Sequence, residues 1–152
     1  MEPLKLSDII GQEIAGVRFH YIPADDDAEY SVPLFYTYIK LANNRIIGIP
    51  HFENAHFETS QESFENGKEI SHWSKFLIGQ KIVDFFFCYF DNEPDYGRSS
   101  YIKLSNDYYF TERTYEFCTF RLFDEQQFLQ EMNNLTKEDI DIRSFLKNKS
   151  VS

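Results

Sequence analysis

The chain contains the same series of short motifs twice, in the same order. Four blocks of the first copy match blocks of the second: residues 10–14 with 78–82, 17–21 with 85–89, an acidic turn at 25–30 with one at 91–96, and 38–43 with 101–106. Four blocks in register indicate an internal repeat, and each copy should fold into the same supersecondary unit. The repeat therefore restricts the fold to two related halves.

Each copy begins with a short amphipathic segment that runs into a glycine. Gly11 and Gly79 suit the left-handed conformation that commonly ends a helix. A strand, an acidic turn and two further strands follow, and an asparagine-containing pair connects the last two strands. Such pairs adopt the positive φ of tight hairpin turns. The expected segments are helices at 6–10 and 73–78, and strands at 17–21, 34–41 and 45–49 matched by 85–90, 100–104 and 108–112.

The strand at 85–90 is apolar on both of its faces. Phe85 and Phe87 alternate with Phe86 and Phe90. A strand of this kind is typical of the centre of a sheet that is covered on both sides. We therefore expect Phe85 and Phe87 to be buried, together with at least one of Phe86 and Phe90.

The chain after the second copy is predicted to form one more strand, at 114–123, and two short helices. Asp124 and Gln127 have the spacing of a capping box at the start of the first helix. Thr136 begins the second predicted helix, which would carry Ile140, Phe145 and Leu146 as its apolar residues.

These patterns predict a single α+β domain over residues 1–152. Two antiparallel meander units would form one sheet or a partly open barrel, with short helices packed on one face. Phenylalanine and tyrosine, which favour strands, contribute 16 and 10 residues and support the β-rich class. The predicted boundaries are about 6–49 for unit one, 50–72 for an acidic connection, about 73–112 for unit two, and 114–147 for the final strand and helices. Connections as long as this one are often functional or mobile.

The charge balance indicates which partners the protein can have. The chain has 25 acidic and 15 basic residues, a net charge of −10. This charge disfavours nucleic acid and anionic membranes and attracts basic partners. The alternative that acidity only keeps a ring-rich protein soluble remains open. Because the first residues lack the basic and apolar regions of a signal peptide, we expect a cytoplasmic protein with reduced thiols.

Motifs for metal binding and catalysis are weak. His51, Glu53, His56 and Glu58 are residues of the kind that ligate zinc or manganese, and a metal-dependent enzyme that uses them is a third interpretation. The two histidines, however, are five residues apart in a predicted loop, whereas a helical zinc motif places them four apart. We expect no metal site in this connection.

Other catalytic arrangements also lack support in the sequence. His20 and Cys88 occupy matching positions of the two copies, which is explained most simply by a repeated core position. Cys88 and Cys118 form neither a metal pair nor a redox motif, and no glycine-rich phosphate loop is present. We therefore expect no cofactor and no catalytic residues.

The composition favours a protein-binding surface, because tyrosine beside carboxylate is common at such surfaces. We expect a non-enzymatic acidic binding protein, a monomer or homodimer, most concretely a bacterial immunity or antitoxin-like inhibitor of a basic partner such as a nuclease toxin. The expected partner-binding residues are Glu53, Glu58, Glu62, Glu65, Asp91, Glu93, Asp95, Tyr36, Tyr38 and Tyr108. A small-molecule or peptide-binding accessory domain with an aromatic-lined cavity is the alternative. The tyrosines have a purely structural explanation as well, in which they cover the edge of the sheet and bind no partner.

Overall fold

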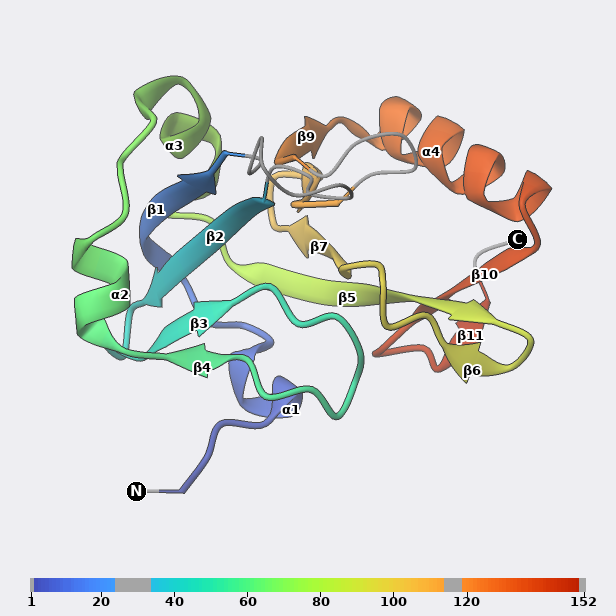
Figure 1. The fold of residues 1–152 in the computed structure, drawn as a ribbon, viewed down its shortest axis with the longest axis horizontal. Coiled ribbons are helices and arrows are strands. Elements are labelled where there is room, and N and C mark those ends of the chain that lie inside the picture. The colour runs from blue at the N-terminus through green and yellow to red at the C-terminus, as the bar shows by residue number, and fades with distance from the viewer. Residues whose placement is uncertain (1, 24–33, 114–118, 151–152) are drawn as a thin grey trace.

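The computed structural model describes residues 2–23, 34–113 and 119–150 and shows the predicted α+β class (Figure 1). Within this part of the chain the strands form two antiparallel sheets. The four-stranded sheet has the order β1 (Ile14–Ile22), β2 (Leu34–Leu41), β3 (Ile46–Gly48) and β4 (Glu58–Thr59). The seven-stranded sheet has the order β11 (Lys149–Ser150), β10 (Ile140–Ser144), β5 (Ile82–Phe90), β7 (Tyr101–Leu104), β8 (Tyr109–Thr111) and β9 (Arg121–Phe123), with β6 (Glu93–Pro94) paired to β5. The helices are α1 (Leu6–Ile9), α2 (Gln61–Glu65), α3 (Ser71–Leu77) and α4 (Glu125–Lys137).

Apart from the two-residue β6 in the second unit, the described elements of the two units follow the same order, α1-β1-β2-β3 and α3-β5-β7-β8. Their glycines have nearly the same backbone conformation, with φ of 89° at Gly11 and 87° at Gly79. Both first strands carry a register shift just after they begin, in β1 after Ile14 and in β5 after Ile82. The predicted internal repeat is thus present in backbone conformation and strand pairing.

The second and third strands of the two units also match. Tyr38 lies opposite Arg18, and Tyr101 lies opposite Phe86, which are equivalent pairs in the two units. The turns that follow use the same device, because Asn44 and Asp107 have φ of 69° and 65°. Each of these residues belongs to the asparagine-containing pair that connects the last two strands of its unit, which the sequence predicts to form a tight hairpin turn.

The two units meet at their glycines through reciprocal hydrogen bonds. The Gly11 amide donates to the Ile82 carbonyl and the Gly79 amide donates to the Ile14 carbonyl, both at 2.8 Å. Such reciprocity is the pattern of an isologous, two-fold contact. One further bridge joins Glu13 to Lys81, and the strands on either side of it belong to separate sheets. The units therefore form two joined sheets, neither one continuous sheet nor a barrel.

Strand β5 lies between two hydrophobic clusters, as its apolar faces predicted. Phe85 and Phe87 are buried in the cluster that α1 and α3 share with both sheets. Phe86 and Cys88 are buried in a second cluster beneath α4. Phe90, at the strand end, is 55% exposed. The prediction that at least one of Phe86 and Phe90 is buried is confirmed.

The C-terminal region is partly different from the prediction. The capping box at Asp124 and Gln127 is present, and α4 follows it. The second helix predicted from Thr136 is wrong, because α4 continues to Lys137 and residues 140–144 form β10 beside β5. Asp139, with φ of 62°, reverses the chain. Alternating burial of Ile140, Ile142 and Ser144 is the period of a strand. Of the predicted strand at 114–123, residues 121–123 form β9, and residues 114–118 lie outside the described part.

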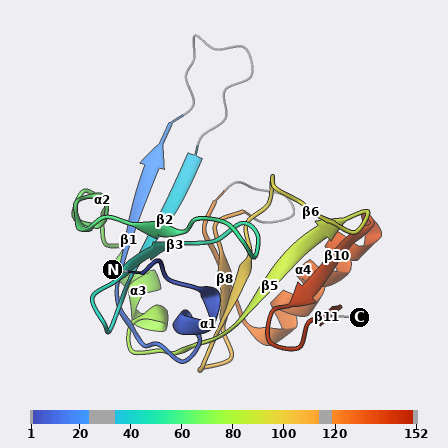
Figure 2. The same ribbon diagram turned by 90° about the horizontal axis from the view of Figure 1, so that it is seen from below.

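The connection between the units contains regular structure. Residues 58–59 add β4 to the edge of β3, and α2 follows with the Ser60 hydroxyl accepting from the Ser63 amide as its N-terminal cap. The far ends of β1 and β2, where Tyr21 and Ile22 are exposed, project from the rest of the protein (Figure 2). The first acidic turn, residues 25–30, lies outside the described residues, whereas the second forms the β5–β6 hairpin.

Candidate functional site

A groove of about 470 Å³ opens beside β2, at the place where β3 ends. Its wall comes from β2, from the segment that joins β3 to β4, and from the end of β8. Most of its side chains are rings, histidines and small residues. The lining residues are Tyr36, Thr37, Tyr38, Gly48, Ile49, His51, Phe52, Ala55, His56, Phe57, Glu58, Thr59 and Glu112. The volume is in the range of ordinary ligand sites.

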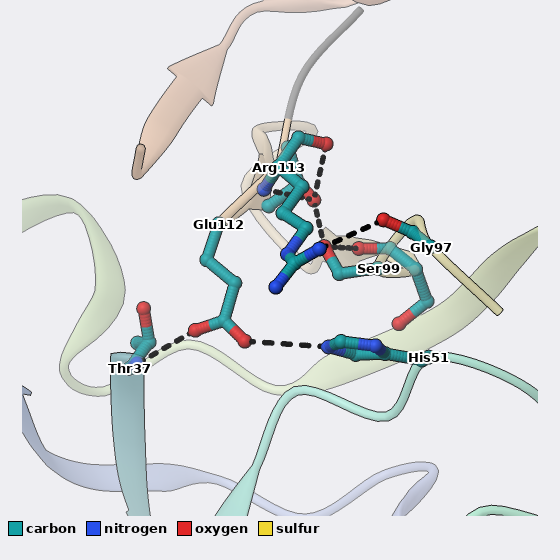
Figure 3. A network of polar contacts seen from close by, with 8 residues as sticks. Thr37, His51, Gly97, Ser99, Glu112 and Arg113 are labelled. Atoms are coloured by element: carbon teal, nitrogen blue, oxygen red, sulfur yellow. Dashed lines mark hydrogen bonds and ion pairs between the residues drawn. The ribbon is translucent and has the colours of Figure 1, made fainter. Parts of the chain in front are cut away.

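Glu112 places a buried carboxyl group in this wall. One of its oxygens, Oε2, accepts a hydrogen bond from the Thr37 amide at 2.7 Å. The other, Oε1, lies 3.9 Å from Nε2 of His51. Figure 3 shows the carboxyl group between these two residues, with Glu112 coming from the second unit, Thr37 from the first and His51 from the connection between the units. The side chain of Glu112 is only 6% exposed.

The backbone explains why Glu112 can reach this position. Strand β3 pairs with β2 only from Tyr38 to Lys40, which leaves the Thr37 amide beyond the ladder. Its equivalent in the second unit is Ser100, whose amide donates to the Pro50 carbonyl at 3.0 Å. Each unit thus receives an acceptor from outside itself at this point: Glu112 of unit two serves Thr37, and Pro50, which directly follows unit one, serves Ser100. In one direction the acceptor is a backbone carbonyl, and in the other it is the carboxylate of Glu112.

The surroundings of the carboxyl group disfavour its ionised form. Burial raises the pKa of Glu112 above its ordinary value, although His51 and the Thr37 amide act in the opposite direction. Burial also raises the pKa of the Tyr38 hydroxyl, and Glu112 adds to that effect. A buried acid in this state gains from a ligand that brings a positive charge.

The groove also contains a buried hydroxyl group without a partner. Oγ1 of Thr37 has no hydrogen-bond partner among the described residues, and the same is true of Oγ of Ser100 at the equivalent position. Native proteins seldom leave buried polar atoms unsatisfied. The Ser99 and Thr111 hydroxyls nearby bond to each other at 2.6 Å, and Arg113 donates to the Gly97 carbonyl at 2.9 Å (Figure 3). On the side of the second unit, the hydroxyls of Ser99 and Thr111 and the guanidinium of Arg113 are therefore satisfied, whereas the Ser100 hydroxyl is not.

Three of the ten predicted partner-binding residues meet at the groove, namely Tyr36, Tyr38 and Glu58. Glu53 is exposed in the segment after β3 and lines a smaller neighbouring pocket. Glu62 and Glu65 are exposed on α2.

The other four predicted residues lie elsewhere. Asp91, Glu93 and Asp95 belong to the β5–β6 hairpin, at the opposite end of the molecule from α2 (Figure 1). Tyr108 packs against Phe76, with ring centroids 5.2 Å apart. The ten residues therefore do not form one continuous face.

Glu58 has a structural partner. Its carboxylate forms a two-point ion pair with the Arg45 guanidinium, including a 2.8 Å hydrogen bond from Nη2 to Oε1. This hydrogen bond lowers the pKa of Glu58. Glu58, which the sequence analysis lists as a partner-binding residue, thus also ties β4 to the turn after β2.

Other chemical groups of the sequence analysis are placed as follows. His51 and His56 both line the groove, but nowhere in the described residues do three His, Cys, Asp or Glu side chains converge as metal ligands. Cys88 is buried beneath α4, and burial raises its pKa to about 12. Its thiol is therefore protonated at neutral pH and is not an activated nucleophile. His20, its counterpart in the repeat, is exposed on β1.

Sequence reasoning missed Glu112 and Thr37 as site residues. The repeat contains a signal for Glu112, because the matching position of the first unit is Ile49, a buried apolar residue. A charged residue at a position that is buried and apolar in the other copy indicates a specific interaction for that residue. The comparison of the two copies could have found this position, although not the partner of the carboxyl group.

Comparison of the chain with protein families, with curated proteins and with solved structures found no match to any of them. In the described part of the chain, helices are too short and too polar to cross a membrane.

Proposed function

We propose that this protein is a non-enzymatic binding protein for a basic protein partner. The observation that carries the proposal is the groove beside β2, whose wall contains tyrosines and other rings together with the buried carboxyl group of Glu112. Rings supply contact area, and a carboxyl group of this kind selects for positive charge. The most concrete form is an immunity or antitoxin-like inhibitor, in a bacterial cytoplasm, of a cationic toxin such as a nuclease.

The net charge of −10 supports the same proposal. A nuclease is basic where it grips phosphate, so an acidic inhibitor would be steered toward that surface and could cover it. Exposed carboxylates act over long range and raise the rate of association, whereas buried contacts at the centre of an interface mainly slow dissociation. In this protein Glu53, Glu62 and Glu65 are exposed. The groove supplies the central contact.

The size of the groove favours a second candidate, a small-molecule or peptide-binding accessory domain. A volume of about 470 Å³ with a ring-lined wall suits such a ligand. The two candidates differ in the role of the exposed carboxylates. A basic protein needs them for association, whereas a small ligand in the groove is insensitive to charges on α2.

The experiment is capture of the partner from the native cell by the tagged chain, with two charge variants as probes. Glu62→Gln/Glu65→Gln removes two predicted contact charges from α2. Asp107→Asn/Glu125→Gln removes two exposed charges outside the predicted set, and Asn tolerates the positive φ of position 107. We expect a basic protein whose capture is weakened by the α2 variant much more than by the control. An acidic or neutral partner, or equal effects of the two variants, would contradict the proposal.

A further inference from the structure

We propose that the groove binds one protonated amine, the ammonium group of a lysine, with Glu112 as its counter-ion. The identity of the molecule that carries this lysine rests on the proposed function, because a basic protein partner is its expected source. The site itself rests on three features of the groove: the carboxyl oxygens, the unpartnered hydroxyl group and the rings.

The two oxygens of Glu112 are not equivalent. Oε2 is engaged by the Thr37 amide at 2.7 Å, whereas His51, the neighbour of Oε1, is at 3.9 Å and beyond hydrogen-bond range. Among the described residues, Oε1 therefore receives no hydrogen bond, and it is the oxygen that can accept one from a ligand. A guanidinium group prefers two parallel hydrogen bonds to both oxygens of a carboxylate, while an ammonium group is a compact charge that needs only one. With Oε2 already bound to the Thr37 amide, a one-point contact through Oε1 favours lysine over arginine.

The rest of the wall suits the other needs of an ammonium group. An ammonium carries three donors, and the hydroxyl oxygen of Thr37, a residue of the groove wall, is buried without a partner in the described structure, so that rotation of this side chain toward a bound ammonium would supply it with one. The rings of Tyr38 and Phe57 line the same groove. Aromatic faces attract cations, and ring-lined cages are a common means of recognising ammonium groups. The apolar part of the wall can cover the methylene stem of a lysine.

Thr37 provides a reporter for the test, because its amide donates directly to Glu112. The amide resonance of Thr37 would be followed by NMR while a probe is added to the ¹⁵N-labelled chain. The probe is N-acetyl-lysine N-methylamide, and its comparison compounds are the arginine analogue and the uncharged norleucine analogue. We expect a saturable shift of the Thr37 resonance with the lysine probe, and at least about tenfold weaker binding of the arginine and norleucine probes, as a lost charge-assisted contact implies.

Two variants localise the effect. Glu112→Gln keeps an acceptor for the Thr37 amide but removes the charge, and should weaken lysine binding at least about tenfold. Glu125→Gln removes an exposed charge on α4, outside the predicted partner-binding set, and should leave lysine binding unchanged. If Glu112→Gln disturbs folding, Tyr38→Leu tests the ring wall and should weaken binding about threefold. Norleucine binding as tightly as lysine, arginine binding as tightly as lysine, or an unaffected Glu112→Gln variant would overturn the assignment.

The two proposals can fail separately. A chain that captures a basic partner but shows no Thr37 response to the lysine probe would refute the ammonium site alone. A chain that binds the lysine probe through Glu112 but captures only an acidic partner would refute the proposed function and leave the ammonium site standing.

Discussion

Gly11 and Gly79 give a quantitative test of the repeat, because replacing either by alanine should cost the same free energy. Their φ values of 89° and 87° lie in the left-handed region, and a Cβ atom at either position would have no atom within 4 Å. The cost is therefore backbone strain without steric overlap, about 1–2 kcal/mol for each substitution. For a chain of this size, that corresponds to a fall in Tm of about 2–8 °C.

The assay is urea unfolding of the wild type, Gly11→Ala, Gly79→Ala and a control, Gly97→Ala. Gly97 is exposed, has a φ outside the left-handed region, and offers a Cβ only an ordinary contact of 3.5 Å with Asp95. Its substitution should change the free energy of unfolding by less than about 1 kcal/mol. Costs at Gly11 and Gly79 that differ by more than about 1 kcal/mol, or that do not exceed the control, would refute the equivalence of the two junctions.

Two further predictions concern the core and the groove. Phe85→Ala should lower the free energy of unfolding by about 3–5 kcal/mol, because its ring is fully buried between the sheets, and urea unfolding measures this cost. Glu112→Gln should become more stable relative to wild type as pH rises above the ordinary carboxyl value of 4.5. Because the folded pKa of Glu112 is raised, the wild type loses stability as pH increases through that pKa, while glutamine does not titrate. A stability difference that is constant from pH 4 to 8 would contradict this reasoning.

The repeat made much of the fold predictable. Matching blocks fixed the order of the helix and three strands in each unit, and the two apolar faces of the strand at 85–90 located its place between two clusters. The helix that local propensity predicted from Thr136 is absent, because residues 140–144 form a strand. Pairing with the open edge of β5 decides the conformation of this segment, and that edge is formed by residues far away in the chain.

The groove was less predictable than the fold. Tyr36, Tyr38 and Glu58 were expected to bind a partner, and they lie on its wall. The carboxyl group in the groove wall depends on a contact between Thr37 and Glu112, which are 75 residues apart in the chain and belong to different units. This contact exists because β3 stops short of Thr37 and leaves its amide free for another acceptor. The sequence pattern within one unit cannot show which residues of the other unit will contact it.

The association rate of the chain with its captured partner, measured on a sensor surface at several salt concentrations, tests the proposed function most directly. We predict that the on-rate falls steeply as salt screens charges beyond about 8–10 Å. Replacing Glu53, Glu62 and Glu65 by glutamine should lower the on-rate further at low salt, while the stability of the chain stays nearly the same because these side chains are exposed. An on-rate that responds neither to salt nor to the triple substitution would contradict the account, and the acidity would then serve solubility alone.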